Sequence, residues 1–258
     1  MFIILGLAII IIFIIAIIFI LVYTLNTTPT PEPTPTPEPT PINSVGSLFF
    51  NSDTGDNGSN VSYNNDENLA IGTRSFTIEW YQNWTKTDGI LSRVFSIGTY
   101  PNVSIAVSYE DSFTIRINNT TLSFDIEPPV NIWSHIAIVG ENGSVIKIYQ
   151  DGVMFGLIDG IYGAYNFTDS STPLMIGNES NPSREANFNG IITNFRWVVG
   201  TAVYTDNFTV PSIPLQNIDG TQLLLDVTSE TNVVKDSSNA NRTPLNNGVL
   251  FSSSLPTI

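Results

Sequence analysis

The sequence predicts an all-β fold, a two-sheet antiparallel jelly-roll sandwich, preceded by one transmembrane helix. Short runs of alternating apolar and polar residues recur from residue 43 onward, and turn-forming Gly, Asn and Asp separate them. No apolar stripe of useful length has helical spacing in that part of the chain. A long apolar run opens the chain. These observations divide it into an anchor (1–25), a Pro/Thr-rich stalk (26–42) and a sandwich (43–258).

The anchor is predicted from an apolar run that extends from Phe2 to Leu25 without a charged residue. Roughly 20 apolar residues are enough to cross a hydrocarbon core of about 30 Å. A cleaved signal peptide has a basic start and a small-residue cleavage site, and this run has neither. We therefore expect an uncleaved signal-anchor, with a cleaved signal peptide as the alternative.

The segment after the anchor indicates where the sandwich lies. Repeated prolines favour a semi-rigid polyproline II spacer, and N-glycosylation sequons recur more often along the chain than composition predicts. We therefore expect a single-pass membrane protein whose C-terminal domain lies outside, at a cell surface or on a virion. No Lys or Arg flanks the anchor, so the positive-inside rule gives no orientation. The alternative is that an Asn-, Ser- and Thr-rich β protein forms sequons by chance. The sequons are at Asn26, Asn57, Asn60, Asn83, Asn102, Asn118, Asn119, Asn142, Asn166, Asn178, Asn207 and Asn241.

The charge balance excludes some partners. The net charge is −14 with 9 Lys and Arg residues, so no basic patch exists to neutralise phosphates of nucleic acid. The same balance disfavours a second contact with anionic lipid. The chain has no cysteine, so any stability outside the cell depends on a large core rather than on disulfides.

The predicted strands follow from the alternation of apolar residues. Each run places its apolar side chains on one face and polar ones on the other. A last strand is expected in "TQLLLDV", residues 221–227. The apolar faces are Phe76, Ile78 and Trp80; Ile105, Val107 and Tyr109; Phe113, Ile115 and Ile117; and Ile191, Phe195, Trp197 and Val199.

The most informative stretch is "WSHIAIVGENGSVIKIYQDG", residues 133–152. Its first strand is apolar on both faces, which indicates a central position in a layered structure. The pairs Asn142-Gly143 and Asp151-Gly152 favour tight turns on either side of the second strand. His135 is the only histidine and has no partner at a catalytic or metal-binding spacing. We expect it to be a hydrogen-bonded core residue. We also expect Trp80, Trp133 and Trp197 to lie in the core.

This hairpin, with "W-x-H-I-A" followed by "I-K-I-Y-Q-D-G", resembles laminin-G-like domains of the concanavalin A-like lectin/glucanase superfamily. The segments Ser47–Trp84 and Pro173–Tyr204 and the closing "QLLLDV…VKDSSNANRTPLNNGVLF" extend the resemblance to nearly all of residues 43–258. It implies a jelly-roll sandwich of two antiparallel sheets and no single activity. Proline-threonine spacers joined to such domains resemble surface proteins of large DNA viruses.

Catalysis is a remote alternative. A retaining glycosidase needs two carboxylates about 5 Å apart, and the glucanase branch takes them from an E-x-D-x-E or E-x-D-x-x-E strand. The acidic clusters of this chain do not fit that pattern, and Glu79 is alone on its strand. We therefore expect a non-catalytic module that binds glycan or protein. The other interpretation is a structural virion or cell-surface protein without a small ligand.

Three residues are candidates for ligand binding. Thr, Lys and Asp follow Trp84, so we expect this tryptophan to be exposed and able to stack on sugar rings. The alternative is that it covers a sheet edge. Tyr100 and Asn102, in "FSIGTYPNVS", are expected near the same edge as the Ile-Gly pair at 176–177.

Calcium is the one metal that the resemblance suggests. Pentraxin-like relatives use a Q-E-x-D stretch after the Ile-Gly pair, where this chain has "IGNESN" with Asn178, Glu179 and Asn181. The fourth residue is an amide here, so the site has less ligand charge and any affinity is expected to be weak. Asp53 and Asp56, in "NSDTGDNGSN", form a second oxygen-rich candidate. The alternative for both stretches is a solvated polar loop.

Overall fold

The computed structural model describes residues 15, 17, 18, 44–51, 58–89, 91–99, 102–169, 171–179 and 186–257. The chain divides into two compact units, residues 1–41 and 42–258. The predicted anchor and stalk therefore lie outside the described residues, apart from three positions. Within the described part, no helix has the length and apolarity that a membrane crossing requires.

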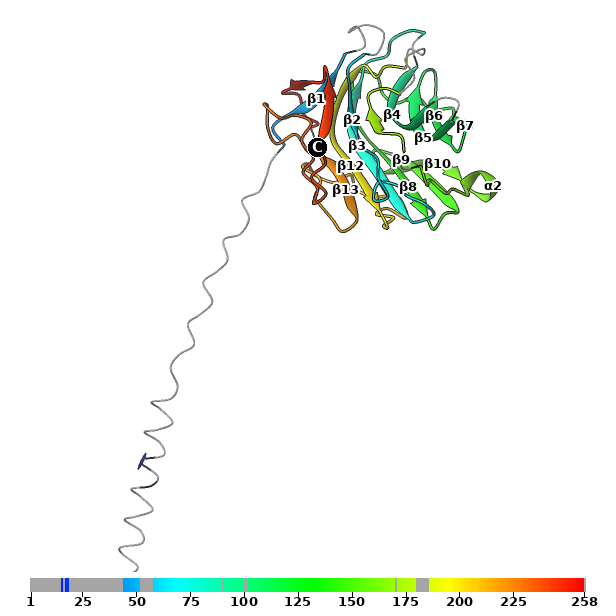
Figure 1. The fold of residues 1–258 in the computed structure, drawn as a ribbon. Coiled ribbons are helices and arrows are strands. Elements are labelled where there is room, and N and C mark those ends of the chain that lie inside the picture. Colours follow the sequence, from blue (N-terminus) through cyan, green and yellow to red (C-terminus); the bar gives the residue numbers. More distant parts are fainter. Residues whose placement is uncertain are drawn as a thin grey trace, which may run out of the picture. The chain divides into compact units, whose positions relative to one another are not determined.

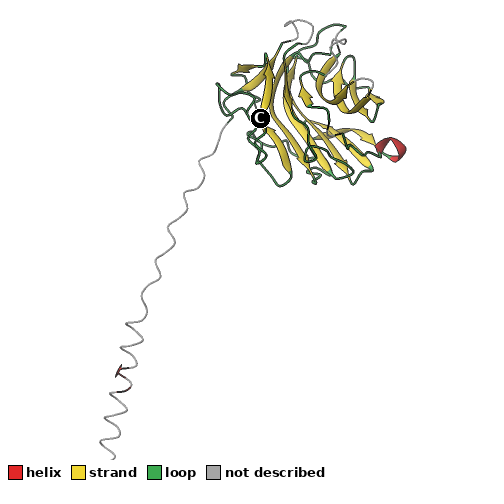
Figure 2. Cartoon of the chain, in the orientation of Figure 1, coloured by secondary structure: helices red, strands yellow, loops and turns green. Residues whose placement is uncertain are grey.

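Residues 42–258 form two stacked antiparallel sheets (Figures 1 and 2). The first sheet has the order β10-β9-β8-β3-β12-β1-β15, and β13 also pairs with β12. The second has the order β14-β2-β11-β4-β5-β6-β7. This arrangement confirms the predicted all-β sandwich. The first sheet contains β1 (Ser47–Phe50), β3 (Phe76–Trp84), β8 (Trp133–Glu141), β9 (Val145–Gln150), β10 (Val153–Ile158), β12 (Gly190–Val199), β13 (Thr221–Leu225) and β15 (Leu250–Ser252). The second contains β2 (Asn60–Tyr63), β4 (Ser92–Thr99), β5 (Asn102–Tyr109), β6 (Phe113–Ile117), β7 (Thr120–Phe124), β11 (Leu174–Ile176) and β14 (Pro244–Asn247).

The core lies between the sheets and is rich in aromatic rings. Phe95 of β4 meets Trp80 of β3 and Trp197 of β12, with ring centroids 5.8 and 5.7 Å apart. Both contacts are edge-to-face, the arrangement that ring quadrupoles favour. Each apolar face expected from the alternation of β3, β5 and β6 lies in this core. The two-residue repeat of side-chain direction in a strand therefore predicts correctly which residues of these strands lie in the core.

The hairpin of β8 and β9 has the position that the sequence predicts. β8 lies between β3 and β9, and both of its faces are buried. Asn142 and Asp151 have φ values of 49° and 50° in the two turns that flank β9. Asn and Asp tolerate this left-handed conformation better than most residues, and a following Gly completes each turn. Trp133 is an exception, because it is half-buried on the outer face of the sheet rather than in the core.

One expected face in β12 is wrong in its first residue. Ile192, not Ile191, lies in the core with Phe195 and Trp197. The pairing of β12 with β3 shifts register between Thr193 and Arg196. Asn194 within this bulge has a φ of 53°. A bulge inserts one extra residue, so the alternation changes phase across it.

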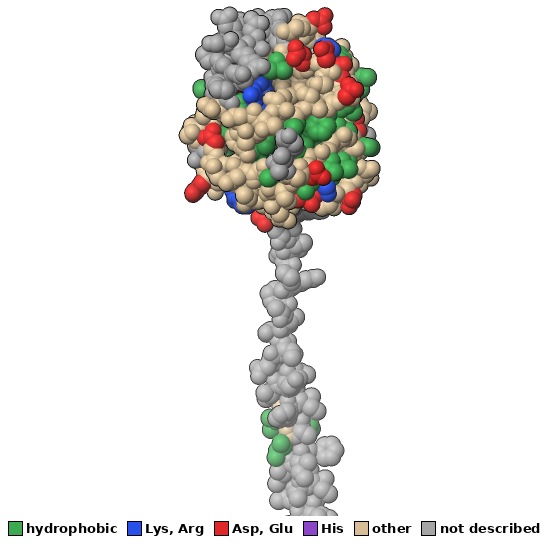
Figure 3. All heavy atoms as spheres, turned by 90° about the vertical axis from the view of Figure 1, so that its right-hand side faces the viewer, with side chains coloured by type: hydrophobic (Ala, Val, Ile, Leu, Met, Phe, Trp, Pro, Cys, Tyr) green, Lys and Arg blue, Asp and Glu red, His purple; other side chains and the backbone are tan. Residues whose placement is uncertain are grey.

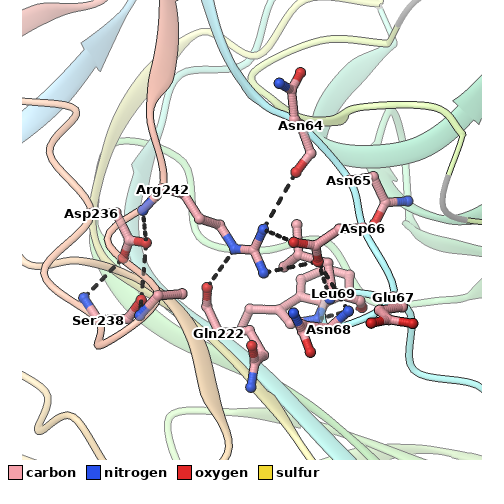
Figure 4. A network of polar contacts seen from close by, with 12 residues as sticks. Asn64, Asn65, Asp66, Glu67, Asn68, Leu69, Gln222, Asp236, Ser238 and Arg242 are labelled. Carbon is pink, nitrogen blue, oxygen red and sulfur yellow. Dashed lines mark hydrogen bonds and ion pairs between the residues drawn. The ribbon is translucent and has the colours of Figure 1, made fainter.

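A polar network fastens the C-terminal segment to the loop after β2 (Figure 4). The Arg242 guanidinium donates to both carboxylate oxygens of Asp66, at 2.9 and 3.0 Å, and to the Gln222 carbonyl. The buried Asp236 carboxylate accepts from the backbone amides of Leu224 and Arg242. The hydrogen bonds from Arg242 hold the pKa of Asp66 below its ordinary value. This bidentate pair fixes two segments that are far apart in sequence.

One edge of the first sheet is β10, which exposes Val153, Met154 and Leu157. Figure 3 shows the side of the molecule that lies to the right in Figure 1, with hydrophobic side chains near the middle of that face. The Asn207 side-chain oxygen accepts a hydrogen bond from the Met154 amide. This contact occupies a backbone donor that would otherwise be open to strand addition.

Candidate functional site

The candidate site lies on the outer face of the second sheet, over β5, β6 and β7. In β6 the residues Phe113, Ile115 and Ile117 face the core, so Thr114 and Arg116 face outward. Small hydroxyl residues of the neighbouring strands share this face and leave a depression of about 380 Å³. We call it the β6–β7 depression. Its lining is Leu91, Arg93, Ser108, Glu110, Asp111, Ser112, Thr114, Arg116, Thr121 and Ser123.

One wall of the β6–β7 depression is held by a buried ion pair. Arg93 donates to Glu179 at 2.8 Å, and both side chains are almost fully buried. Arg93 also donates to the Ser108 hydroxyl at 3.3 Å. A guanidinium with paired neighbours has a fixed orientation. The inner wall is therefore preorganised.

The part of the rim at the β5–β6 turn is acidic and more exposed. Glu110 and Asp111 lie in the turn between β5 and β6. Lys86 bridges Asp111 at 3.2 Å and Glu127 at 2.7 Å. These two carboxylates raise the pKa of Lys86, so its ammonium remains charged. The rim therefore offers acceptors while the floor offers guanidinium and hydroxyl donors.

A smaller depression lies where β6 turns into β7. Asn118 and Asn119 occupy this turn with φ values of 45° and 69°, and the Asn119 side-chain oxygen accepts from the Val103 amide at 2.6 Å. The depression measures about 310 Å³. We call it the amide depression. Its lining is Asn102, Val103, Ser104, Asn118, Asn119, Asn166, Thr168 and Asp169.

The three predicted ligand-binding residues do not lie together in the described structure. Trp84 is buried, with only 1 % of its surface exposed, and its indole N–H donates to the Ser92 hydroxyl. Its expected exposure is therefore wrong, because the ring packs against Tyr109 between the sheets. Asn102 is exposed in the amide depression. Tyr100 lies outside the described residues.

Of the predicted calcium ligands, two lie in the described part of the chain and three lie outside it. Asn178 and Glu179 are both buried. The Asn178 side-chain oxygen accepts from the Glu179 amide, and Glu179 is bound by Arg93. A guanidinium beside the carboxylate repels a cation, so these two residues do not fit calcium. The structure describes no group of three or more acidic, His or Cys side chains able to hold a metal. Asn181, Asp53 and Asp56 lie outside the described residues, so their role stays a prediction.

The sequons also fall into groups. Asn60 and Asn178 are buried, so a glycan there would require local unfolding. Asn83 is half-buried, and Asn26 and Asn57 lie outside the described residues. The remaining acceptors are on the surface, and four of them line the amide depression. The exposed acceptors are Asn102, Asn118, Asn119, Asn142, Asn166, Asn207 and Asn241.

His135 belongs to a network on the outer face of the first sheet, not to either depression. Glu79 is fully buried and accepts from His135 Nε2, the Tyr204 hydroxyl and Arg196. Burial raises the pKa of Glu79, but the His135 hydrogen bond and the Arg196 charge outweigh it and lower the pKa. The carboxylate is therefore ionised, and His135 donates to it through Nε2. This confirms His135 as a hydrogen-bonded core residue.

Sequence reasoning missed the β6–β7 depression. The alternation in "FTIRIN" placed Thr114 and Arg116 on the polar face of a strand, which was the available signal. The neighbours of Arg116 across the sheet, Ala106 and Thr121, come from separate strands. Their proximity depends on strand order, which the local pattern does not encode.

Comparisons with known proteins agree with this architecture. Residues 53–201 match the family model of the concanavalin A-like lectin/glucanases superfamily. A Bacteroides ovatus protein described as a candidate carbohydrate-binding protein is 16% identical, with a TM-score of 0.60. That alignment covers 83% of this chain and 61% of the other, so the chain spans about three fifths of the Bacteroides protein.

A second similar structure is a heptameric SAP-like pentraxin from Limulus polyphemus. It is 12% identical with a TM-score of 0.55, and the alignment covers 82% of this chain and 96% of the pentraxin. No curated protein sequence matches the chain. At these identities the structural likeness shows the fold alone. The family match covers more than half of the sequence, and the chain therefore belongs to the concanavalin A-like lectin/glucanase superfamily.

Proposed function

We propose that this chain is a non-catalytic carbohydrate-binding module, held at a cell or virion surface by its N-terminal anchor. The β6–β7 depression is the observation that carries the proposal. It is concave, lies on the outer side of β5, β6 and β7, and combines guanidinium groups, carboxylate acceptors and hydroxyls within about 380 Å³. Sugar hydroxyls donate and accept hydrogen bonds at once, so a site with both kinds of partner suits them.

The fold and the similar structures support this choice without naming the ligand. The family contains lectins and glucanases, and the Bacteroides protein is described as a candidate for carbohydrate binding. Among the described lining residues none is aromatic. Affinity is therefore expected from hydrogen bonds rather than from stacking. Single sugars would bind weakly, since one hydrogen bond contributes only about 0.5–1.5 kcal/mol.

The test is a glycan array probed with the full-length chain, purified in mild detergent, in calcium and then in EDTA. Arg116→Ala removes a guanidinium from the floor of the depression. Lys235→Ala removes an exposed cation elsewhere and serves as the charge-matched control. We expect binding to selected glycans that Arg116→Ala weakens by roughly tenfold and Lys235→Ala leaves unchanged.

The outcomes separate the alternatives. Binding that EDTA abolishes would point to calcium and to Asp53, Asp56 and Asn181 instead of the β6–β7 depression. An array with no signal in either buffer would contradict glycan recognition and favour the structural surface protein. Signal unaffected by Arg116→Ala would place the ligand at another site.

The surface location is tested independently of the ligand. We expect the full-length chain to remain in the membrane fraction after alkaline carbonate extraction, and a chain starting at residue 43 to be released. We also expect externally added protease to reach the sandwich on intact cells or virions. Release of the full-length chain by carbonate would contradict the anchor.

A further inference from the structure

We propose that the ligand is an extended, uncharged oligosaccharide that occupies both depressions at once. This inference rests on the proposed function and adds the size and charge class of the ligand. The outward positions of β6 run from Thr114 through Arg116 to Asn118 at the turn. Thr114 and Arg116 line the β6–β7 depression, and Asn118 lines the amide depression. The two hollows therefore lie along one strand.

The path between the hollows runs over β6 and β7. Arg116 pairs with Ala106 on one side and with Thr121 on the other. Ala106 is fully buried, whereas Thr121 is exposed. A ligand chain that passes from one hollow to the other therefore crosses Arg116 and Thr121. From Ser112 to Asn118 the strand rises by about 20 Å at roughly 3.4 Å per residue, a length for several sugar units.

The amide depression is built for a neutral polar ligand. The Asp169 carboxylate accepts four hydrogen bonds from the main chains and hydroxyls of Ser171 and Thr172. The hydrogen bonds outweigh the effect of burial and lower the pKa of Asp169, so it is an ionised structural group. The other polar side chains of the lining are amides and the hydroxyls of Ser104 and Thr168. Each amide carries both a donor and an acceptor, which matches sugar hydroxyls.

The charges around the β6–β7 depression disfavour an anionic ligand. Arg93 is paired with Glu179, and Lys86 bridges Asp111 and Glu127 at the rim. The other charged groups of the lining are the Arg116 guanidinium and the exposed Glu110 carboxylate, whose charges offset each other. The whole chain carries a net charge of −14. The depression therefore has no excess of positive charge to attract an anion, and a polyanion would meet long-range repulsion from the negative charge of the whole chain. An uncharged chain meets no such cost.

The turn between β6 and β7 is preorganised for this role. The backbone N–H of Asn118 donates to the Ser104 carbonyl, and the side-chain oxygen of Asn119 accepts from the backbone N–H of Val103. These contacts join the turn to the start of β5. The amide side chain of Asn118 is exposed on this fixed turn. A ligand therefore binds a formed surface with little ordering cost.

The experiment is a length series measured by calorimetry with the full-length chain. The protein is made in a bacterial host so that the amides carry no glycan. The probes are the neutral glycan series with the strongest array signal, from monosaccharide to hexasaccharide, and an acidic series of matched lengths. Asn118→Gly removes one amide from the second hollow while keeping the left-handed turn accessible. Asn142→Gly makes the same change in the β8–β9 turn, outside both depressions.

We expect affinity in the neutral series to rise by roughly tenfold or more between disaccharide and hexasaccharide. Asn118→Gly should remove most of that gain, and Asn142→Gly should leave the affinity at every length unchanged. Equal affinity at all lengths, a gain insensitive to Asn118→Gly, or preference for the acidic series would overturn the inference while glycan binding stands. Absence of binding to every probe would overturn both.

Discussion

The two outer faces of the sandwich differ in what covers them. The outer face of the first sheet is covered by residues 200–216, which we call the covering segment. Ala202, Tyr204 and Phe208 of this segment pack on one cluster, and Val210 and Ile213 pack on a second. The outer face of the second sheet over β6 and β7 is open and polar. On the covered face a buried ionic network holds the covering segment. On the open face the Arg93–Glu179 pair and the Lys86 bridges instead order the wall and rim of a depression that a ligand can enter.

The covered face also contains a buried charge network centred on Glu79. Arg196 donates to Glu79 through Nε at 2.9 Å and through Nη2 at 2.5 Å. Tyr204 brings the covering segment to the same carboxylate at 2.8 Å. The Tyr81 hydroxyl also donates to the Pro211 carbonyl in this segment. His135, the only histidine, also contacts this segment, with its ring centroid 6.4 Å from that of Tyr204 and 5.8 Å from that of Phe208.

The largest effect is expected from Glu79→Ala. This change leaves the buried Arg196 guanidinium without its carboxylate and should cost about 3–5 kcal/mol of unfolding free energy. Urea titration followed by tryptophan fluorescence measures it. Arg116→Ala on the open face is the matched comparison and should cost less than about 1 kcal/mol. A similar cost for both variants would remove the distinction between the faces.

The second-largest effect is expected from acid, which should lower the stability of the protein by protonating carboxylates of the covered face. The folded pKa of Glu79 is lowered, so its contribution to stability is present above the unfolded pKa and disappears as pH falls through the lowered folded value. Asp66 acts in the same direction. Melting temperature should therefore fall as pH drops below about 4.5. Glu79→Gln should melt lower at neutral pH and show a shallower acid dependence; an unchanged slope would contradict the assignment.

A smaller effect is expected from Tyr204→Phe. The substitution keeps the ring that stacks on Phe208 and removes only the hydroxyl that donates to Glu79. Loss of this hydrogen bond to a charged acceptor should cost about 1.5–3 kcal/mol. Ser123→Ala on the open face, which removes a long hydroxyl contact to Thr114, should stay within about 0.5 kcal/mol. Equal melting curves for the two variants would show that the covering segment is not held by this contact.

Glycan occupancy tests which asparagines are exposed and which are buried, and it requires no change in stability. If the sandwich passes through a glycosylating secretory pathway, peptide mass spectrometry should find glycans on exposed acceptors such as Asn207 and Asn241. It should find none on Asn60 and Asn178 in folded protein, because both side chains are buried. Glycans at Asn118 or Asn166 would cover the amide depression and reduce binding of long oligosaccharides. Full occupancy of Asn60 in native protein would contradict the burial.

Much of the fold could be predicted from the sequence, because local alternation reports directly which side chains are inside. The faces of β3, β5 and β6 and the turns around β9 follow from residues close in sequence. In β12 the first residue of the inward face was predicted wrongly because of a bulge at Asn194, which the alternation of apolar and polar residues does not reveal. The polar residues after Trp84 suggested exposure, but its ring packs on Tyr109 from the other sheet. The site was missed for the same reason, since it depends on contacts between strands.

The most direct test of the account is calorimetric titration of the strongest array glycan into wild-type protein and Arg116→Ala, with thermal melting measured on the same samples. The account predicts that Arg116→Ala loses affinity by roughly tenfold while its melting temperature matches wild type. Unchanged affinity would contradict the open face as the ligand site. Loss of affinity together with a large fall in melting temperature would instead make Arg116 part of the structural framework.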